Sequence, residues 1–241
     1  MKIKYYMSVM AAAGFIFFIA QPFALGQTTN SAMGSDREFG KPFPTYFKIK
    51  GHVRSPLFQT IMEGDTVRAV EMIKAGTNVN EQIEGNITPL MVSASMGQTS
   101  VVQALLERGA NRAATNREGR TALMLATLNG RTDVIPLLLD RSSGVNAADA
   151  LGRTPLILAV MNGHTNRVIT ILSTEVNVNA KDQKGKTALN WAATSGLENI
   201  ARLLLAKGAD TTIKDNTGWI AEDYARTLKR TNLVELLKRG H

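Results

Sequence analysis

The apolar residues of the chain are grouped in short segments with helical spacing. Residues 101–106 place valine and leucine at i, i+3 and i+4 positions, and residues 200–205 do the same with isoleucine and leucine. This spacing is typical of a helix that buries one side and exposes the other. It predicts short packed helices, which we expect to begin near Thr99, Thr132, Thr165 and Glu198.

These segments belong to a unit of 33 residues. A threonine followed two residues later by leucine opens the unit four times, at Thr88, Thr121, Thr154 and Thr187. The same register reaches Ser55 at one end and Ile220 at the other, where the motif has decayed. A second series keeps the step with glycine, at Gly64, Gly97, Gly130, Gly163 and Gly196. Two registers that share one period indicate a repeat architecture.

The chemistry of the unit predicts its parts. Serine or threonine accepts a hydrogen bond from the free amides of a first helical turn, and proline suits the next position because it needs no donor there. We therefore expect helices to open at Ser55-Pro56, Thr88-Pro89 and Thr154-Pro155. Glycine ends each helix with a positive φ. A second helix and a loop follow, and Asn86 stands at the loop turn where later units have glycine.

The repeated motifs resemble those of the ankyrin repeat family. The matching segments are Gly119-Arg120-Thr121-Ala122-Leu123-Met124-Leu125-Ala126 and Gly185-Lys186-Thr187-Ala188-Leu189-Asn190-Trp191-Ala192-Ala193. The resemblance covers residues 53–241. It implies an all-α solenoid of stacked helix-turn-helix units with hairpin loops, in about six repeats that include a cap at each end. The family's usual histidine after Thr-Pro-Leu is replaced by Met91, Met124, Ile157 and Asn190.

Two departures from the repeat pattern lie in the middle of the chain. Pro136 falls near the end of the first turn of its helix, which predicts a shifted or kinked start. Ser142 and Glu175 stand where other repeats have a helix-ending glycine. Both departures predict that the middle repeats are the softer part of the stack.

The first 26 residues follow a different pattern. Lys2 and Lys4 precede an apolar run that extends from Tyr5 to Ala20, and small residues follow it. This order is typical of a secretory signal peptide, and we expect cleavage after Gly26. An uncleaved membrane anchor is the alternative, but the run is shorter than the about 20 residues that a spanning helix needs. We expect a protein of the bacterial periplasm, with secretion as the alternative.

Residues 27–52 form a lead segment before the repeats. It begins polar and then places Phe39, Phe43, Tyr46 and Phe47 among lysines. One interpretation is that these aromatic side chains pack onto the first repeat and cover its exposed face. The other is that they form a docking segment for a partner or for an anionic envelope surface.

The resemblance also implies where a partner binds. Ankyrin repeats usually meet partners on the concave surface that the hairpin tips and the first helices form. The variable positions of that surface predict ten contact residues: Ile87, Met96, Arg120, Leu128, Asn129, Arg153, Met161, Asn162, Lys186 and Trp219. Arginine and tryptophan beside apolar side chains are typical of binding hot spots. The alternative is that the basic residues are ordinary for this loop and the methionines belong to the core.

From these positions we expect that Arg120, Arg153 and Lys186 can be replaced together with loss of partner binding and almost no change in melting. The expectation assumes that packing does not require the three side chains.

Charge and composition narrow the function. The net charge is +8, which becomes +6 once Lys2 and Lys4 are removed with the leader, and this favours an acidic partner. The basic residues are not gathered in dense runs, so nucleic acid is disfavoured. His52, His164 and His241 have no metal-ligand spacing, the chain has no cysteine, and the glycines follow the repeat step. We therefore expect no catalytic site, no metal and no cofactor.

The sequence predicts a monomeric, non-enzymatic scaffold or adaptor that binds another protein. The alternative is an immunity or inhibitor protein that blocks a toxin enzyme.

Overall fold

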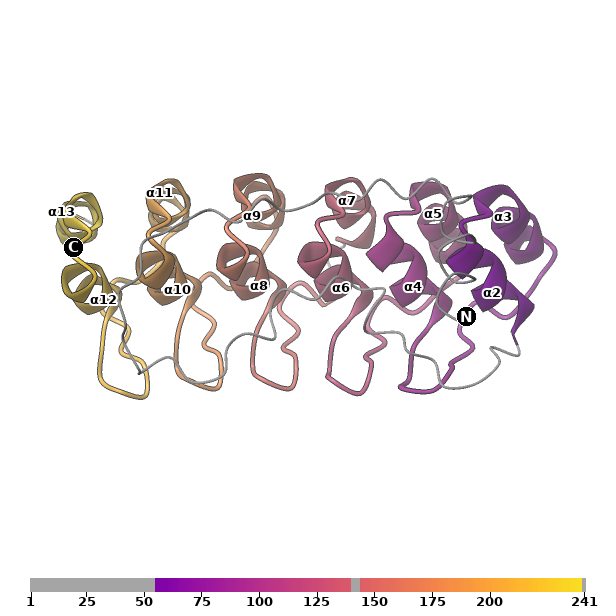
Figure 1. Ribbon diagram of the computed structural model, residues 1–241, viewed down its shortest axis with the longest axis horizontal. Coiled ribbons are helices and arrows are strands. Elements are labelled where there is room, and N and C mark those ends of the chain that lie inside the picture. Colours follow the sequence, from indigo (N-terminus) through magenta and orange to yellow (C-terminus); the bar gives the residue numbers. More distant parts are fainter. Residues whose placement is uncertain (1–54, 140–143, 240–241) are drawn as a thin grey trace, which may run out of the picture. The chain divides into compact units, whose positions relative to one another are not determined.

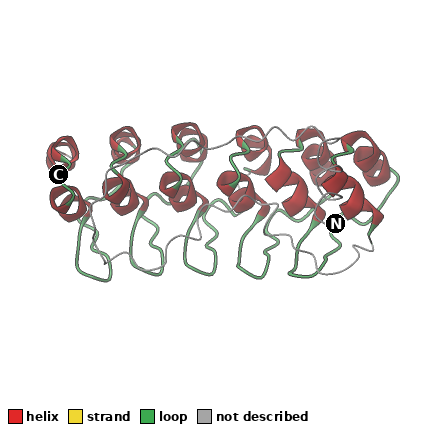
Figure 2. Ribbon diagram, in the orientation of Figure 1, coloured by secondary structure: helices red, strands yellow, loops and turns green. Residues whose placement is uncertain are grey.

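The computed structural model describes residues 55–139 and 144–239. The predicted signal peptide, the lead segment, the domain boundary at residue 53 and Ser142 lie outside the described residues. The described part contains α-helices and loops but no strand (Figure 2). The all-α prediction is therefore confirmed for these residues.

The helices lie in two rows, because each repeat contributes one helix to each row (Figure 1). The first row consists of α2 (Pro56–Glu63), α4 (Pro89–Met96), α6 (Ala122–Leu128), α8 (Pro155–Met161), α10 (Ala188–Ser195) and α12 (Ala221–Thr227). The second row consists of α3 (Thr66–Lys74), α5 (Thr99–Glu107), the 3-10 turn η3 (Thr132–Val134) with α7 (Ile135–Leu138), α9 (Thr165–Leu172), α11 (Glu198–Ala206) and α13 (Thr231–Arg239). Helices of adjacent repeats are neighbours within each row.

The first helices begin where the sequence predicts, and for the predicted reason. Thr88 Oγ1 accepts the backbone N–H of Met91 at 3.3 Å, and Thr154 Oγ1 accepts that of Ile157 at 3.3 Å. Ser55, Thr121 and Thr187 cap their helices in the same way. Each of these hydrogen bonds satisfies an amide that the helix itself leaves unpaired.

A side chain from the following repeat closes the end of several first helices. Three arginines, Arg131, Arg167 and Arg230, each donate to a carbonyl oxygen in the last turn of a first helix. The acceptors are, in that order, the carbonyls of Ser95 at 2.9 Å, Thr127 at 2.7 Å and Thr194 at 3.1 Å. A positive charge at a helix C-terminus also offsets the partial negative charge there. These contacts hold successive repeats in register.

Gly196 shows why glycine is needed at the end of α10. Its φ is 74°, a conformation that other residues rarely adopt. A Cβ at this position would also lie 1.3 Å from Nη1 of Arg230. The glycine therefore lets the arginine of the last repeat reach the end of α10.

The third repeat departs from the others at its second helix. Where α5 and α11 each have nine residues, this repeat has the three-residue 3-10 turn η3 followed by the four-residue α7. Pro136 lies at the start of α7 and has no N–H with which to continue a helix from Thr132. The predicted shift of this helix is confirmed.

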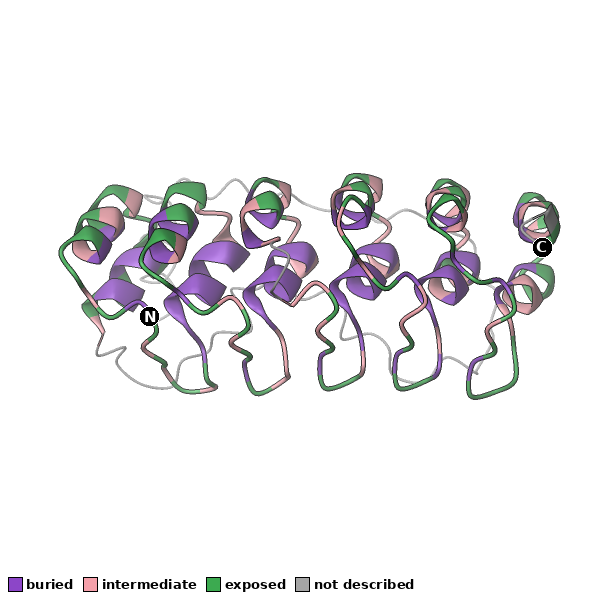
Figure 3. Ribbon diagram, turned by 180° about the vertical axis from the view of Figure 1, so that it is seen from behind, coloured by how far each residue is buried: buried purple, intermediate pink, exposed green. Residues whose placement is uncertain are grey.

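The core is one continuous apolar layer between the two rows (Figure 3). The positions that replace the family histidine are all buried, with Met91 and Met124 fully buried and Ile157 and Asn190 each 1% exposed. Asn190 keeps a polar role, because its Oδ1 accepts the backbone N–H of Thr187 at 2.9 Å. The other replacements fill the same space with apolar side chains.

Neighbouring loops are joined by a ladder of hydrogen bonds. A backbone N–H of each hairpin donates to a carbonyl of the hairpin before it. The pairs are Arg117 to Gly85, Ala150 to Glu118, Gln183 to Leu151 and Asn216 to Lys184, at 2.8–3.0 Å. Asparagine side chains add a second link, since Asn146 Oδ1 accepts the N–H of Asn177 at 2.7 Å and Asn179 Oδ1 that of Asp210 at 2.8 Å. The loops are therefore fixed to one another.

Leu204 tests the contribution of the shared core. Its side chain is fully buried in α11, so we expect Leu204→Ala to lower the free energy of unfolding by about 2–5 kcal/mol. Chemical denaturation followed by circular dichroism measures the change. Leu228→Ala is the control, because Leu228 is 42% exposed and its loss should cost less than about 0.5 kcal/mol. Equal losses for the two variants would contradict this core.

Candidate functional site

The hairpin loops lie beside the first-helix row, on the side away from the second helices (Figure 1). A polar residue organises each of four loops, at Asn116, Asp149, Asp182 and Asp215, and these positions keep the 33-residue step. In each loop one side-chain oxygen accepts the backbone N–H groups two and four residues later, as in Glu118 and Arg120 after Asn116. These hydrogen bonds fix the backbone of the loop.

The sequence reasoning missed these four buried residues. Their 33-residue spacing, which matches that of the threonines and glycines, is the signal that marks them in the sequence. In the structure, the second carboxylate oxygen of each of the three aspartates accepts a hydrogen bond from a side chain of the site.

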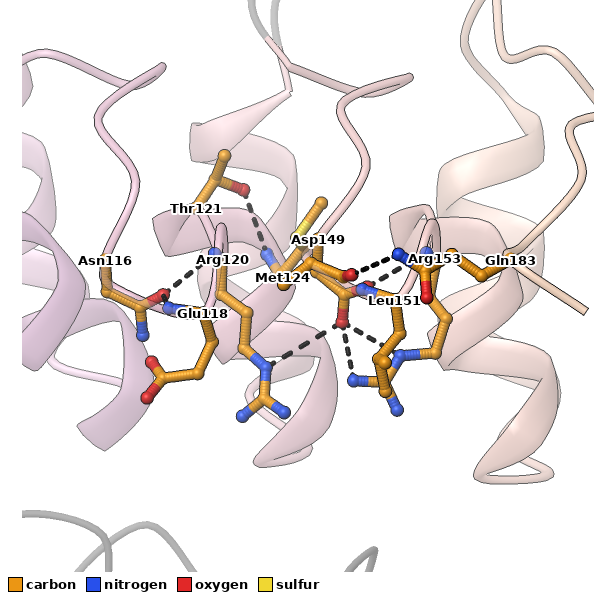
Figure 4. Close-up of polar contacts among 10 residues, drawn as sticks. Asn116, Glu118, Arg120, Thr121, Met124, Asp149, Leu151, Arg153 and Gln183 are labelled. Carbon is orange, nitrogen blue, oxygen red and sulfur yellow. Dashed lines mark hydrogen bonds and ion pairs between the residues drawn. The ribbon is translucent and has the colours of Figure 1, made fainter.

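Asp149 binds Arg153, the middle one of the three basic residues among the predicted contacts. Its Oδ2 accepts hydrogen bonds from Nε of Arg153 at 2.8 Å and from Nη2 at 2.6 Å. Nε of Arg120, from the preceding loop, lies 3.9 Å from the same oxygen (Figure 4). The carboxylate therefore lies between two guanidinium groups of successive repeats. The side chains of Arg153 and Asp149 are 5% and 1% exposed, so this ion pair is internal.

Two of the ten predicted contact residues are buried. Arg153 is 4% exposed as a residue and is bound to Asp149. Ile87 is also 4% exposed and belongs to the apolar core, and its backbone forms an isolated bridge with Ile83. The expectation that packing does not require Arg153 is therefore wrong, because a charge in the core needs its partner.

The other predicted residues lie at the surface to different degrees. Trp219 is exposed, and the rest are half-buried: Met96, Arg120, Leu128, Asn129, Met161, Asn162 and Lys186. Met96 and Met161 pack against the core with part of their surface. Asn129 donates to the carbonyl of Leu125 at 2.8 Å. The structure thus retains eight of the ten as candidate contacts.

Lys186 and Trp219 belong to a cluster with two aromatic rings that the sequence reasoning did not assign to the surface. Nζ of Lys186 lies 4.7 Å from the centre of the Trp191 ring and 4.2 Å from that of the Tyr224 ring. Tyr224 in turn contacts Trp219, with the ring centres 5.0 Å apart and the planes inclined at 57°. A cation over aromatic faces is held by the charge distribution of the rings.

Buried carboxylates orient both rings. Trp191 Nε1 donates to Oδ2 of Asp182 at 2.8 Å, and the Tyr224 hydroxyl donates to Oδ2 of Asp215. Burial raises the pKa of Asp215, but hydrogen bonds from Thr217, from Tyr224 and from backbone N–H groups outweigh it and lower the pKa below its usual value. Burial first, and the Asp215 hydrogen bond second, raise the pKa of Tyr224 to about 12. The tyrosine therefore stays a neutral donor.

Leu151 is a further surface residue that the prediction did not include. It lies at a hairpin tip and is 49% exposed (Figure 4). Its position next to the turn glycine Gly152 marks it in the sequence, but an apolar residue there was not considered.

Among residues 55–139 and 144–239, no three His, Asp or Glu side chains are placed to hold a metal ion. Burial, and to a lesser degree the charge of Arg167, lower the pKa of His164. The surface instead offers exposed apolar and basic side chains on loops that hydrogen bonds keep fixed.

Comparison with known proteins agrees with this architecture. A family model described as ankyrin repeats (3 copies) matches residues 57–149 and 141–215. The chain belongs to the ankyrin repeat family. A search of curated proteins found no match. Within the described ranges of this ankyrin-repeat chain, none of the helices has the length and apolar character needed to cross a membrane.

The internal ion pair makes Arg153 and Arg120 unequal. We expect Arg153→Gln to lower the free energy of unfolding by about 3 kcal/mol, because it leaves the buried Asp149 without its hydrogen-bonded cation. Arg120→Gln should cost less than about 1 kcal/mol, since its side chain is 22% exposed and its contact is longer. Urea denaturation of both variants measures the difference, and a larger loss for Arg120→Gln would contradict the assignment.

Tyr224 gives a pH test of the aromatic cluster. Its folded pKa of about 12 exceeds the value of about 10 expected in the unfolded chain. The neutral form is therefore favoured by folding, and this stabilisation is complete below pH ~10 and is lost as the pH rises through about 12. The ultraviolet titration curve of the Tyr224→Phe variant is subtracted from that of the unchanged protein, and the difference reports the ionisation of Tyr224. Ionisation of Tyr224 at its ordinary pKa would rule out the contact with Asp215.

Proposed function

We propose that this ankyrin-repeat protein is a non-enzymatic scaffold or adaptor of the bacterial periplasm. It acts as a monomer and holds another protein on the surface that the hairpin loops and first helices form. The observation that carries the proposal is the combination of exposed apolar side chains with a fixed loop backbone. Leu151 and Trp219 are 49% and 38% exposed, on loops whose conformation Asp149 and Asp215 determine.

Fixed loops make this surface suited to binding. A partner that meets preorganised side chains loses little binding energy to the ordering of the loop. Aromatic, methionine and arginine side chains, which are enriched in interfaces, occur here as Trp219, Met96, Met161 and Arg120.

The N-terminal pattern supports the periplasmic part of the proposal. Residues 1–26 have the charged, apolar and small-residue order of a signal peptide, which leaves Gln27 as the first residue of the mature chain. Cysteine is absent, so the repeats fold without disulfides in an oxidising compartment.

The proposal predicts that partner capture depends on the hairpin surface. Leu151 and Ile169 allow a matched comparison, because each is 49% exposed, one on a hairpin and the other on α9 of the second row. The full chain with a C-terminal tag is expressed in a bacterium, crosslinked, and recovered from the periplasmic extract. We expect Leu151→Ser to reduce the crosslinked partner by about tenfold and Ile169→Ser to leave it unchanged.

The same experiment tests the location, since the recovered chain should begin at Gln27. A chain that stays in the cytoplasm would contradict the periplasmic assignment. Crosslinks that map to α9 and survive Leu151→Ser would contradict the proposed surface.

A further inference from the structure

The tips of the last two hairpins carry exposed lysines and buried aspartates. Residues 181–186 and 214–219 carry four lysines, of which Lys181, Lys184 and Lys214 are exposed and Lys186 is half-buried. The carboxylates in the same stretches, Asp182 and Asp215, are 8% and 7% exposed. The two loops are joined by the hydrogen bond from Asn216 N to Lys184 O at 3.0 Å. They therefore form one continuous basic surface.

The basic residues of the earlier hairpins are arginines, and two of them lie against carboxylates. Arg117 lies 3.8 Å from the exposed Glu84 of the neighbouring loop, so the two charges offset each other. In the next hairpin Arg153 is buried against Asp149. The exposed lysines of the described loops are thus gathered in the C-terminal repeats, whereas the hairpin before Arg153 presents the exposed Arg117 and the half-buried Arg120.

An aromatic platform lies within this basic surface. Trp219 is exposed and contacts Tyr224, and Lys186 covers the rings of Tyr224 and Trp191. Asp182 and Asp215 hold the two inner rings by hydrogen bonds. An apolar group that contacts Trp219 would therefore meet a side chain that is already supported, which lowers the entropic cost of binding.

We infer that residues 181–186 and 214–219, with Trp219, bind an extended acidic segment of the partner protein. Carboxylates of that segment pair with Lys181, Lys184 and Lys214, and an apolar side chain of the segment packs against Trp219. This inference rests on the proposed scaffold function and assigns its partner a chemistry.

The geometry favours a peptide over other anionic ligands. Single-stranded nucleic acid stacks its bases on successive aromatic faces. Of the three rings here, Trp219 alone is exposed, and Trp191 and Tyr224 are half-buried. A membrane surface would need a broad apolar face beside the lysines. The observed surface instead has one apolar anchor among charges, which suits a single segment.

The test uses a labelled peptide of alternating Glu and Leu, with a Lys–Leu peptide of equal length as the ligand control. The chain is purified from cells that export it and remove its leader. Binding of the peptide is then followed by fluorescence anisotropy at low salt. We expect the Glu–Leu peptide to bind and the Lys–Leu peptide not to bind. Trp219→Ala should weaken binding by about 30-fold, the loss of one hot-spot side chain.

Charge reversal separates the surface from net charge. The double variant Lys184→Glu with Lys214→Glu should abolish binding. Its matched control, Lys207→Glu with Lys238→Glu, makes the same change at exposed lysines of the second-helix side and should leave binding intact. Circular dichroism melts confirm that each variant is folded, and because all four lysines are exposed, the charge variants remain informative if Trp219→Ala unfolds.

Several results would overturn the inference. They are equal binding of both peptides, binding that Trp219→Ala and the Lys184/Lys214 variant do not change, and absence of binding. Tighter binding of anionic phospholipid vesicles or of single-stranded DNA than of the Glu–Leu peptide would assign the surface to those ligands instead. If the peptide fails while Leu151-dependent partner capture persists, the acidic-segment inference is wrong and the scaffold function stands.

Discussion

Each helix pair of this protein needs its neighbour to cover its apolar side. A single repeat has two short helices that cannot enclose a core between them. In the structure, each first helix packs against the first helices of adjacent repeats, and the second helices do the same. The remaining features serve that stacking. Threonine caps fix where a helix begins, glycine lets the chain leave it, and an arginine from the next repeat closes its end. The hairpins are then held side by side by the backbone ladder.

Most of this architecture follows from the sequence because it depends on local chemistry. The start of α4 is determined by Thr88 and Pro89, and Asn86, at the loop turn where later units have glycine, has a positive φ of 59°. The irregular second helix of the third repeat was likewise visible in Pro136. Such features require only knowledge of a few consecutive residues and of the period.

The contact residues of the hairpin surface were predicted less well, because their exposure depends on which side chains surround them in the folded loops. Arg120, Arg153 and Lys186 occupy the same slot in successive repeats, yet they have different surroundings. Arg153 binds the carboxylate of Asp149, four residues earlier. The equivalent carboxylate, Asp182, accepts a hydrogen bond from Trp191, and Nζ of Lys186 lies over two aromatic rings. Ile87 occupies the slot too, and its apolar side chain turns inward. Equal position in a repeat thus does not mean equal exposure, since the side chains that surround each position differ from one repeat to the next.

The shortened helix of the third repeat has a consequence for how the stack comes apart. In a linear array, cooperativity passes only through neighbouring interfaces, and a weak one divides the array into blocks that open separately. The sequence predicts that the middle repeats are the softer part, and a division at η3 and α7 would leave two helix pairs before it and three after it. The aromatic platform lies wholly in the later block. A ligand held there would slow the opening of α8–α13 and leave the exchange of amide hydrogens in α2–α5 almost as it was.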